Sequence, residues 1–178
     1  ALHSKVVLTT SIVLIVLGTV LLKFTEHISW MGAFFHSISA RTAGISTYSI
    51  GEFTNAGLFV LCVLMFIGAS PGSTGGGIKT STFFVLAQST RSMFSKQAVG
   101  AFKRSISSQN VSKAYAISML SALVVIVATF LLCVLEPEFQ FIQLLFEVIS
   151  AFGTVGLSTG ITPDLSGAGK LVIILVMF

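Results

Sequence analysis

Apolar residues fill two long uncharged runs of the chain, at residues 6–22 (VVLTTSIVLIVLGTVLL) and 115–135 (YAISMLSALVVIVATFLLCVL). A helix rises about 1.5 Å per residue, so each run is about long enough to cross a hydrocarbon core of ~30 Å. The absence of charge throughout both runs is typical of helices that contact lipid. The pattern therefore predicts two membrane-spanning helices.

Two further apolar stretches, residues 29–39 (SWMGAFFHSIS) and 139–150 (FQFIQLLFEVIS), are too short to span a bilayer. Each follows one of the long runs and leads into a segment of small residues, Thr-Ala-Gly-Ile at 42–45 and Thr-Val-Gly-Leu at 154–157. Short apolar helices in this setting are expected to be re-entrant or interfacial. We expect both to dip into the membrane from its outer face.

The chain also repeats itself, because residues 35–47 align with residues 146–159 with one extra residue in the second copy. A single Thr-x-Gly triplet is most often a packing motif in membrane helices. Two triplets in register, each after a short helix, favour a different role. Non-helical backbone at membrane depth must be buried in protein or line a water-filled cavity, and carbonyl oxygens around a cation do the latter. The repeat predicts a unit of helix, pore helix, filter and helix.

A glycine-rich segment at residues 68–82 (GASPGSTGGGIKTST) interrupts a third apolar stretch. Ile78 separates Gly77 from Lys79, so the segment lacks the Gly-Lys-Ser/Thr run of a nucleotide-binding Walker A loop. Pro71 and the glycines disfavour helix. A helix expected over residues 53–91 must therefore break halfway, either as a mobile loop that faces a wet cavity or as a static kink packed against its neighbours.

Composition and charge support a membrane protein. The 178 residues are 54% hydrophobic and 9% charged, whereas soluble domains carry about 25% charged residues. The net charge of +4 does not indicate nucleic-acid binding, because five basic residues gather between residues 91 and 113, where no acid occurs. By the positive-inside rule this linker is cytoplasmic. Cys62 and Cys133 fall in apolar runs and suggest neither a disulfide nor a metal site. The linker's basic residues are Arg91, Lys96, Lys103, Arg104 and Lys113.

Three segments carry a family resemblance: SARTAG at 39–44, GASPGSTGGGIKT at 68–80 and SAFGTVGL at 150–157. With them the chain resembles the membrane subunit of the Ktr/Trk/HKT superfamily of potassium transporters, and is most similar to the Ktr type. The resemblance covers essentially the whole chain. It implies four helix–pore helix–filter–helix repeats around one pore, of which this chain carries the third and fourth. We therefore expect a fragment of an all-α integral membrane protein of potassium-channel-like architecture.

The resemblance also divides the chain and assigns its sites. The third repeat is expected at residues 1–90, a basic linker at 91–113 and the fourth repeat at 114–178. The transported K+ ion is expected to bind the backbone carbonyls of Thr42, Ala43, Gly44, Thr154, Val155 and Gly156. The gate is expected to be the intramembrane loop, comprising Gly68, Ala69, Ser70, Pro71, Gly72, Ser73, Thr74, Gly75, Gly76, Gly77 and Lys79.

Three polar residues near these segments have separate interpretations. We expect Lys79 to face the inner vestibule, where it either extends toward the cytoplasm or repels permeating ions. Arg41 is expected to bond carbonyls at the C-terminus of the pore helix, with pairing to Glu147 as the alternative. His36, which aligns with Glu147, is expected to be a hydrogen-bonded packing residue rather than a pH sensor.

The predicted function is potassium uptake across a bacterial plasma membrane, without enzymatic activity. A less selective Na+/K+ transporter is the first alternative. An intramembrane enzyme is a second, although Asp164 is the only aspartate and none of the three histidines lies in a long apolar run. A structural scaffold is a third. The resemblance implies a homodimer and a cytosolic nucleotide-binding regulatory ring as partners, Na+ as a possible activator, and no nucleotide bound by this chain itself.

Overall fold

The computed structural model describes residues 2–41, 43–73, 75–95, 100–101, 104–105 and 107–178. Thr42, Thr74, Lys96 and Lys103, which carry predictions above, lie outside the described residues. The first half of the chain contains α1 (Leu2–Thr25), α2 (Trp30–Ser39), α3 (Asn55–Phe66) and α4 (Thr80–Ser95). The second half contains α5 (Ser108–Leu135), α6 (Phe141–Phe152) and α7 (Gly167–Met177). The predicted all-α class is confirmed.

Short elements join these helices. The 3-10 turns η1 (Ile50–Glu52) and η2 (Thr162–Asp164) precede α3 and α7. Between α4 and α5, β1 (Gly100–Ala101) pairs antiparallel with β2 (Arg104–Ser105), which is the one paired ladder among the described residues.

The helices α1 and α5 are the two described helices that are long and apolar enough to cross a membrane. They contain the two runs from which spanning helices were predicted. Large apolar side chains on both helices are exposed, including Leu8 and Ile12 of α1 and Leu120, Leu123 and Ile126 of α5. Apolar residues on an outer face are expected of helices surrounded by lipid.

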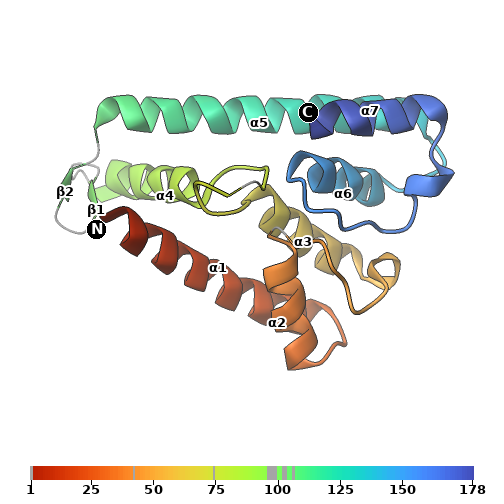
Figure 1. The fold of residues 1–178 in the computed structure, drawn as a ribbon, viewed down its shortest axis with the longest axis horizontal. Helices are drawn as coiled ribbons and strands as arrows, with labels where there is room; N and C mark the ends of the chain where they lie inside the picture. Colours follow the sequence, from red (N-terminus) through yellow and green to blue (C-terminus); the bar gives the residue numbers. More distant parts are fainter. Residues whose placement is uncertain (1, 42, 74, 96–99, 102–103, 106) are drawn as a thin grey trace.

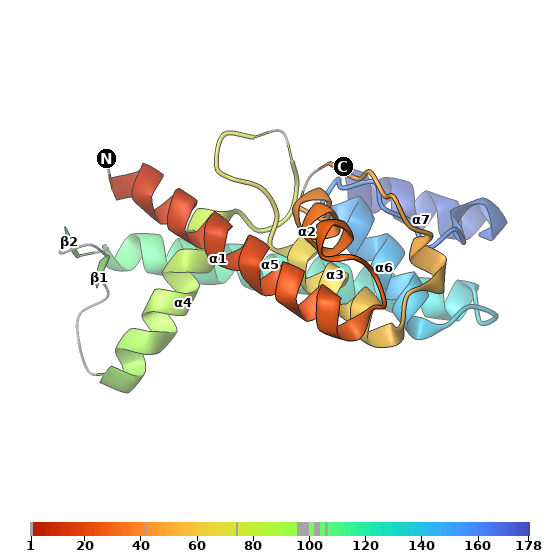
Figure 2. The same cartoon turned by 90° about the horizontal axis from the view of Figure 1, so that it is seen from below.

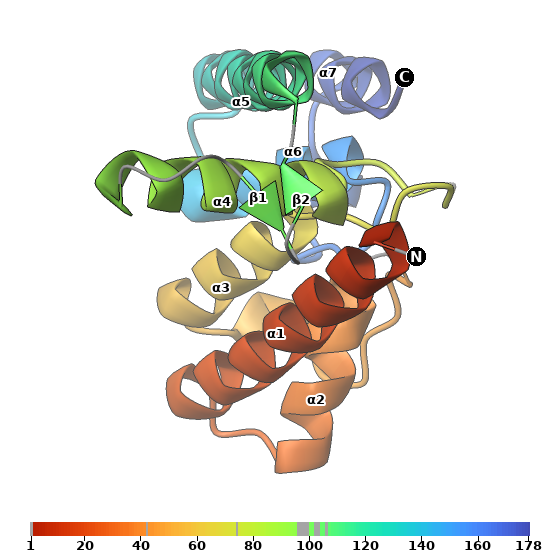
Figure 3. The ribbon, with the colours of Figure 1, turned by 90° about the vertical axis from the view of Figure 1, so that its left-hand side faces the viewer.

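The helices form three layers. Figure 1 shows α5 and α7 side by side above α4 and α6, with α1, α2 and α3 beneath them. Figure 3 shows the same layers from one end. The N-terminus of α1 and the β1–β2 ladder lie at the same end of the molecule (Figures 1 and 2). The two short helices α2 and α6 lie toward the opposite end, away from the β1–β2 ladder (Figure 1).

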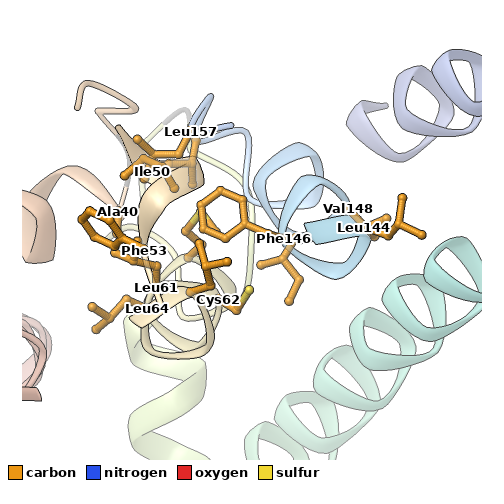
Figure 4. Close-up of a cluster of buried hydrophobic side chains, with 14 of the residues drawn as sticks. Ala40, Ile50, Phe53, Leu61, Cys62, Leu64, Leu144, Phe146, Val148 and Leu157 are labelled. Atoms are coloured by element: carbon orange, nitrogen blue, oxygen red, sulfur yellow. The ribbon is translucent and has the colours of Figure 1, made fainter. Parts of the chain in front are cut away.

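The core lies where α3 meets α6. Leu61 of α3 and Phe146 of α6 are completely buried there, and Cys62 lies between them and is a free thiol (Figure 4). Within a bilayer such a core is stabilised by close packing rather than by removal from water. Small residues allow α1 and α2 to pack closely. The Ser37 hydroxyl of α2 donates to the Ile15 carbonyl of α1 at 2.9 Å, and it lies beside Gly18 of α1.

The third helix of each half, α3 and α7, begins with the same arrangement. Glu26 follows α1, and its Oε1 accepts hydrogen bonds from the N–H and the hydroxyl of Thr54, the N-cap of α3, at 2.9 and 2.7 Å. Glu136 follows α5, and its Oε1 accepts from the N–H of Ser166, the N-cap of α7, at 2.8 Å. A carboxylate at a helix N-terminus is favourable because unpaired N–H groups gather there.

Glycines make room for these carboxylates. A Cβ atom at Gly57 would lie 1.9 Å from the Glu26 Oε1, and one at Gly169 would lie 2.4 Å from the Glu136 Oε1. Both glycines occupy the third helical position after the cap, so the two halves of the chain share this detail as well as their topology.

Candidate ion-conduction site

A serine in the last turn of each short helix, Ser39 in α2 and Ser150 in α6, holds the segment after it. The carbonyl of Ser39 accepts from the N–H groups of Ala43 and Gly44 at 3.0 and 3.2 Å, and its hydroxyl donates to the carbonyl of Ile45. In the second half the carbonyl of Ser150 accepts from Val155 N–H at 3.0 Å and its hydroxyl donates to the Leu157 carbonyl. Each candidate filter segment is therefore fixed at both ends to its own helix.

The two segments meet through their backbones. Gly44 has φ +66° and Gly156 has φ +93°, a region that disfavours residues with a side chain. A Cβ at Gly44 would lie 1.9 Å from the Val155 carbonyl oxygen, so only glycine fits there. Thr154 also has a positive φ of +50°, which is uncommon for a threonine and is typical of strained functional backbone. The structure places the predicted residues Ala43, Gly44, Thr154, Val155 and Gly156 in these two segments.

Different side chains support the two segments from behind. His36 of α2 is fully buried, its Nδ1 hydrogen-bonds the Gly32 carbonyl at 2.9 Å, and its ring contacts those of Phe35, Tyr48 and Phe53. It therefore has the packing role expected of it.

Glu147, at the matching position of α6, is buried and accepts four hydrogen bonds of 2.8 to 2.9 Å from the segment after the filter. The donors are the hydroxyls of Ser158, Thr159 and Thr162 and the N–H of Thr159. These partners leave the alternative of an Arg41–Glu147 pair without support.

The helix break predicted in the glycine-rich segment is present. Helix α3 ends at Phe66 and α4 begins at Thr80. The two ends of the intervening loop lie together, because Ile67 and Ile78 form a parallel bridge and Ile78 N–H donates to the Phe66 carbonyl at 3.0 Å. Between these ends the chain bulges away from the helices (Figure 2).

The loop also contacts the second filter segment. Gly76 N–H donates to the Gly153 carbonyl at 3.1 Å and to the Thr154 hydroxyl oxygen at 2.7 Å. A Cβ at Gly76 would lie 2.5 Å from the Phe152 carbonyl oxygen, so the approach requires glycine. The loop and the second candidate filter segment are thus in direct hydrogen-bonded contact.

Two cations hold the loop at other points. The Arg41 Nη2 donates to the Gly68 carbonyl at 3.3 Å, so the guanidinium bonds a carbonyl as expected, but one of the loop rather than of the pore helix. The Lys79 ammonium donates to the carbonyls of Ser73 and Gly75. This intraloop role differs from the expected extension toward the cytoplasm, because carbonyls freed by the helix break lie close enough to satisfy the charge.

A cavity of about 650 Å³ lies between the loop, the filter base and α1. Its lining includes Ser11 of α1, Arg41, Thr154 and the loop residues Ser70 and Gly75. Polar backbone at membrane depth is tolerated around such a cavity.

Comparison with known proteins identifies the family. Residues 3–178 match the TrkH family model, described as cation transport protein. The chain belongs to the TrkH family of cation transport proteins. Members of this family are transporters rather than enzymes, which agrees with the prediction of a non-enzymatic chain and leaves the intramembrane enzyme unsupported.

Relatives in this TrkH family include Ktr proteins. The chain is 40% identical over 188 residues to the Ktr system potassium uptake protein B of Vibrio alginolyticus, covering 98% of this chain and 41% of that protein. It is 45% identical over 148 residues to the Ktr system potassium uptake protein D of Bacillus subtilis, covering 81% and 32%. It is 38% identical over 194 residues to the potassium/sodium uptake protein NtpJ of Enterococcus hirae, covering 99% and 43%.

A solved structure supports the TrkH fold. The potassium transporter TrkH from Vibrio parahaemolyticus aligns with a TM-score of 0.73 and 21% identity, covering 99% of this chain and 41% of that one. The chain thus spans less than half the length of these relatives.

Sequence reasoning missed several residues that build this TrkH-type site. It did not assign the roles of Ser39, Ser150 and Glu147, nor the contact of Gly76 with Gly153. The available signals were the serine at the same place in both repeats and the hydroxyl-rich segment after the second filter, with Ser158, Thr159 and Thr162 downstream of Glu147.

Proposed function

We propose that this chain forms two repeats of a potassium uptake subunit that conducts K+ through backbone carbonyls. The filter comprises residues 42–44 and 154–156, and the K+ ion is its substrate. The observation that carries the proposal is the meeting of two glycine-containing segments, each after a short helix, with the Val155 carbonyl oxygen directed at Gly44. The names of the Ktr relatives support potassium as the ion.

The filter can be tested with a matched pair of glycines. Gly156 lies in the filter and Gly160 lies four residues beyond it; their φ values are +93° and +96°, and a Cβ at either would meet no atom within 4 Å. Alanine costs each site a similar amount, about 1–2 kcal/mol for a left-handed residue. In liposomes containing the full-length protein, Gly156→Ala should lower the ratio of K+ to Na+ flux by roughly tenfold, and Gly160→Ala should leave it near the wild-type value.

Gly44→Ala provides the stronger test, because its Cβ would also collide with the Val155 carbonyl oxygen. Wild-type ion preference in both Gly44→Ala and Gly156→Ala would contradict the filter. A wild-type protein that carries Na+ as fast as K+ would instead favour the alternative of a less selective Na+/K+ transporter, to which the name of the Enterococcus relative points.

The loop at residues 68–80 is proposed to be the gate of this pore. Its support is the break between α3 and α4, the contact of Gly76 with the filter base and the cavity beneath. Deletion of residues 73–76 should raise K+ flux and make it independent of regulatory partners, since the obstruction is removed and the filter kept. A deletion variant with wild-type flux, both with and without those partners, would indicate a static kink.

The orientation and partners belong to the same proposal. We place the filter on the extracellular side of the plasma membrane and the linker at residues 91–113 in the cytoplasm. The common position of the N-terminus and the β1–β2 ladder supports this placement (Figure 1). The proposal also includes a homodimer of the subunit and a cytosolic nucleotide-binding ring that binds near the linker. Na+ is proposed to activate transport. Crosslinking of a cysteine placed in the linker to the ring would test the partner.

A further inference from the structure

The C-terminal end of α6 faces the loop with exposed acceptor atoms. The last carbonyls of a helix have no intrahelical partner and carry partial negative charge, which makes this end favourable for a cation. At α6 the Gly153 carbonyl and the Thr154 hydroxyl lie at this position, and the Thr154 hydroxyl donates its proton to the Gly153 carbonyl at 2.8 Å. The lone pairs of the Thr154 hydroxyl oxygen are therefore available to a further partner on the side of the cavity.

That partner is the N–H of Gly76, which donates to both oxygens. The positive end of this amide dipole thus lies where a cation leaving or entering the filter base would find the same two acceptors. The close approach depends on the missing side chain at Gly76, since a Cβ would lie 2.5 Å from the Phe152 carbonyl oxygen and 3.0 Å from the Gly153 carbonyl carbon.

The equivalent end of α2 is arranged differently. Arg41 directly follows the C-cap Ala40, and its guanidinium donates to the Gly68 carbonyl at the start of the loop. This end of the pore therefore has a permanent cation beside it. The aligned position in the second half is Phe152, whose ring packs against Phe66 with centroids 6.0 Å apart. Among the described residues, an exchangeable donor from the loop faces the filter base at α6 and not at α2.

We infer that the Gly76 N–H and a permeant cation compete for the Gly153 carbonyl and the Thr154 hydroxyl oxygen. Docking of the loop and occupation of this innermost cation position are then mutually exclusive, and K+ itself favours release of the loop. The inference rests on the proposed function, since it gives the regulation of the same filter.

The test measures loop docking rather than flux. Ser73→Cys places a thiol on the exposed part of the loop in the full-length protein, and wild-type protein with Cys62 and Cys133 gives the background. Its modification by a charged thiol reagent is followed in rising K+ at constant ionic strength, with N-methylglucamine as the replacing cation. K+ should accelerate modification between about twofold and tenfold, the range expected for the loss of one to two hydrogen bonds. N-methylglucamine should have no effect.

Further variants sharpen the test. Gly76→Ala in the Ser73→Cys background should be modified rapidly without K+. Gly72→Ala strains the loop backbone at φ +87° but its Cβ meets no atom within 4 Å, so it controls for strain alone and should keep the K+ response. If Gly76→Ala does not fold, Thr154→Val should abolish the K+ response and Thr154→Ser should retain it.

The inference and the proposed function fail differently. Modification that is independent of K+, or slowed by it, in a protein that conducts K+ selectively would overturn the competition and leave the transporter intact. A protein without K+ flux and without a K+ effect on modification would overturn both.

Discussion

The two halves of the chain support almost the same backbone with different chemistry. Each has a long helix, a glutamate that caps the later helix, a short helix with an anchoring serine in its last turn, and a glycine at positive φ. Behind the candidate filter, however, the first half packs the ring of His36 among aromatic rings, whereas the second half places the carboxylate of Glu147 among hydroxyls. Symmetry of the backbone therefore does not require symmetry of the side chains.

This difference separates two ways of holding a filter segment. Aromatic packing around His36 positions Tyr48 by shape, with one hydrogen bond from the imidazole to its own helix. The Glu147 carboxylate binds the backbone and hydroxyls of residues 158–162 directly, and hydrogen bonds to a charged group are stronger than neutral ones. The second segment, which also contacts the loop, is thus the one with the stronger polar support.

The largest effect is expected when Glu147 is replaced, because its carboxylate supplies the polar support of the second segment. Glu147→Ala should destabilise the protein by about 3–5 kcal/mol, because four hydrogen bonds are lost and the Thr159 N–H is left buried without an acceptor. His36→Phe, which keeps a ring and loses one hydrogen bond, should cost about 1 kcal/mol. The melting midpoint of the full-length protein in detergent measures both.

A matched control is Glu138→Ala, since Glu138 is exposed in the same half of the chain and should change stability by less than about 0.5 kcal/mol. Equal losses for Glu147→Ala and His36→Phe would show that the carboxylate has no special role in holding the second segment.

The helices of the fold could be predicted from the sequence more fully than the side-chain contacts. The spanning helices, the short helices and the break at residues 67–79 follow from the length of apolar runs and from proline and glycine, which act locally. The apolar stretch that predicts α6 ends at residue 150, whereas the helix continues to Phe152.

Side-chain partners were less predictable because they join residues far apart in sequence. Arg41 contacts Gly68 and Gly76 contacts Thr154, and no local pattern specifies either distance. The alignment of His36 with Glu147 indicated that the position matters, but it could not show that hydroxyls surround one and rings the other.

The second expected effect sharpens the comparison at the two capping glutamates. Glu26→Ala removes two hydrogen bonds to Thr54 and should cost about 2–3 kcal/mol, whereas Glu136→Ala removes one to Ser166 and should cost about 1.5 kcal/mol. Melting midpoints of the two variants should therefore differ in this order. Glutamine at either position keeps an acceptor oxygen and should recover part of the lost stability. A larger loss for Glu136→Ala than for Glu26→Ala would contradict the explanation by the number of hydrogen bonds removed.

The smallest expected effect concerns the serines in the last turns of the two short helices, Ser39 and Ser150. Ser39 donates to the Ile45 carbonyl and accepts from the Ile45 N–H at 2.9 Å, while Ser150 donates to the Leu157 carbonyl. Ser39→Ala should therefore cost about 1–2 kcal/mol and Ser150→Ala about 1 kcal/mol. Ser112→Ala, which removes an exposed hydroxyl on α5, serves as the control and should cost less than about 0.5 kcal/mol. Because the residue after each filter glycine loses its tether, both pore-helix variants should also lower the ratio of K+ to Na+ flux, which liposome assays measure. Reduced stability with unchanged ion preference in both would mean that the serines support the helices alone and that the filter segments are held by other contacts.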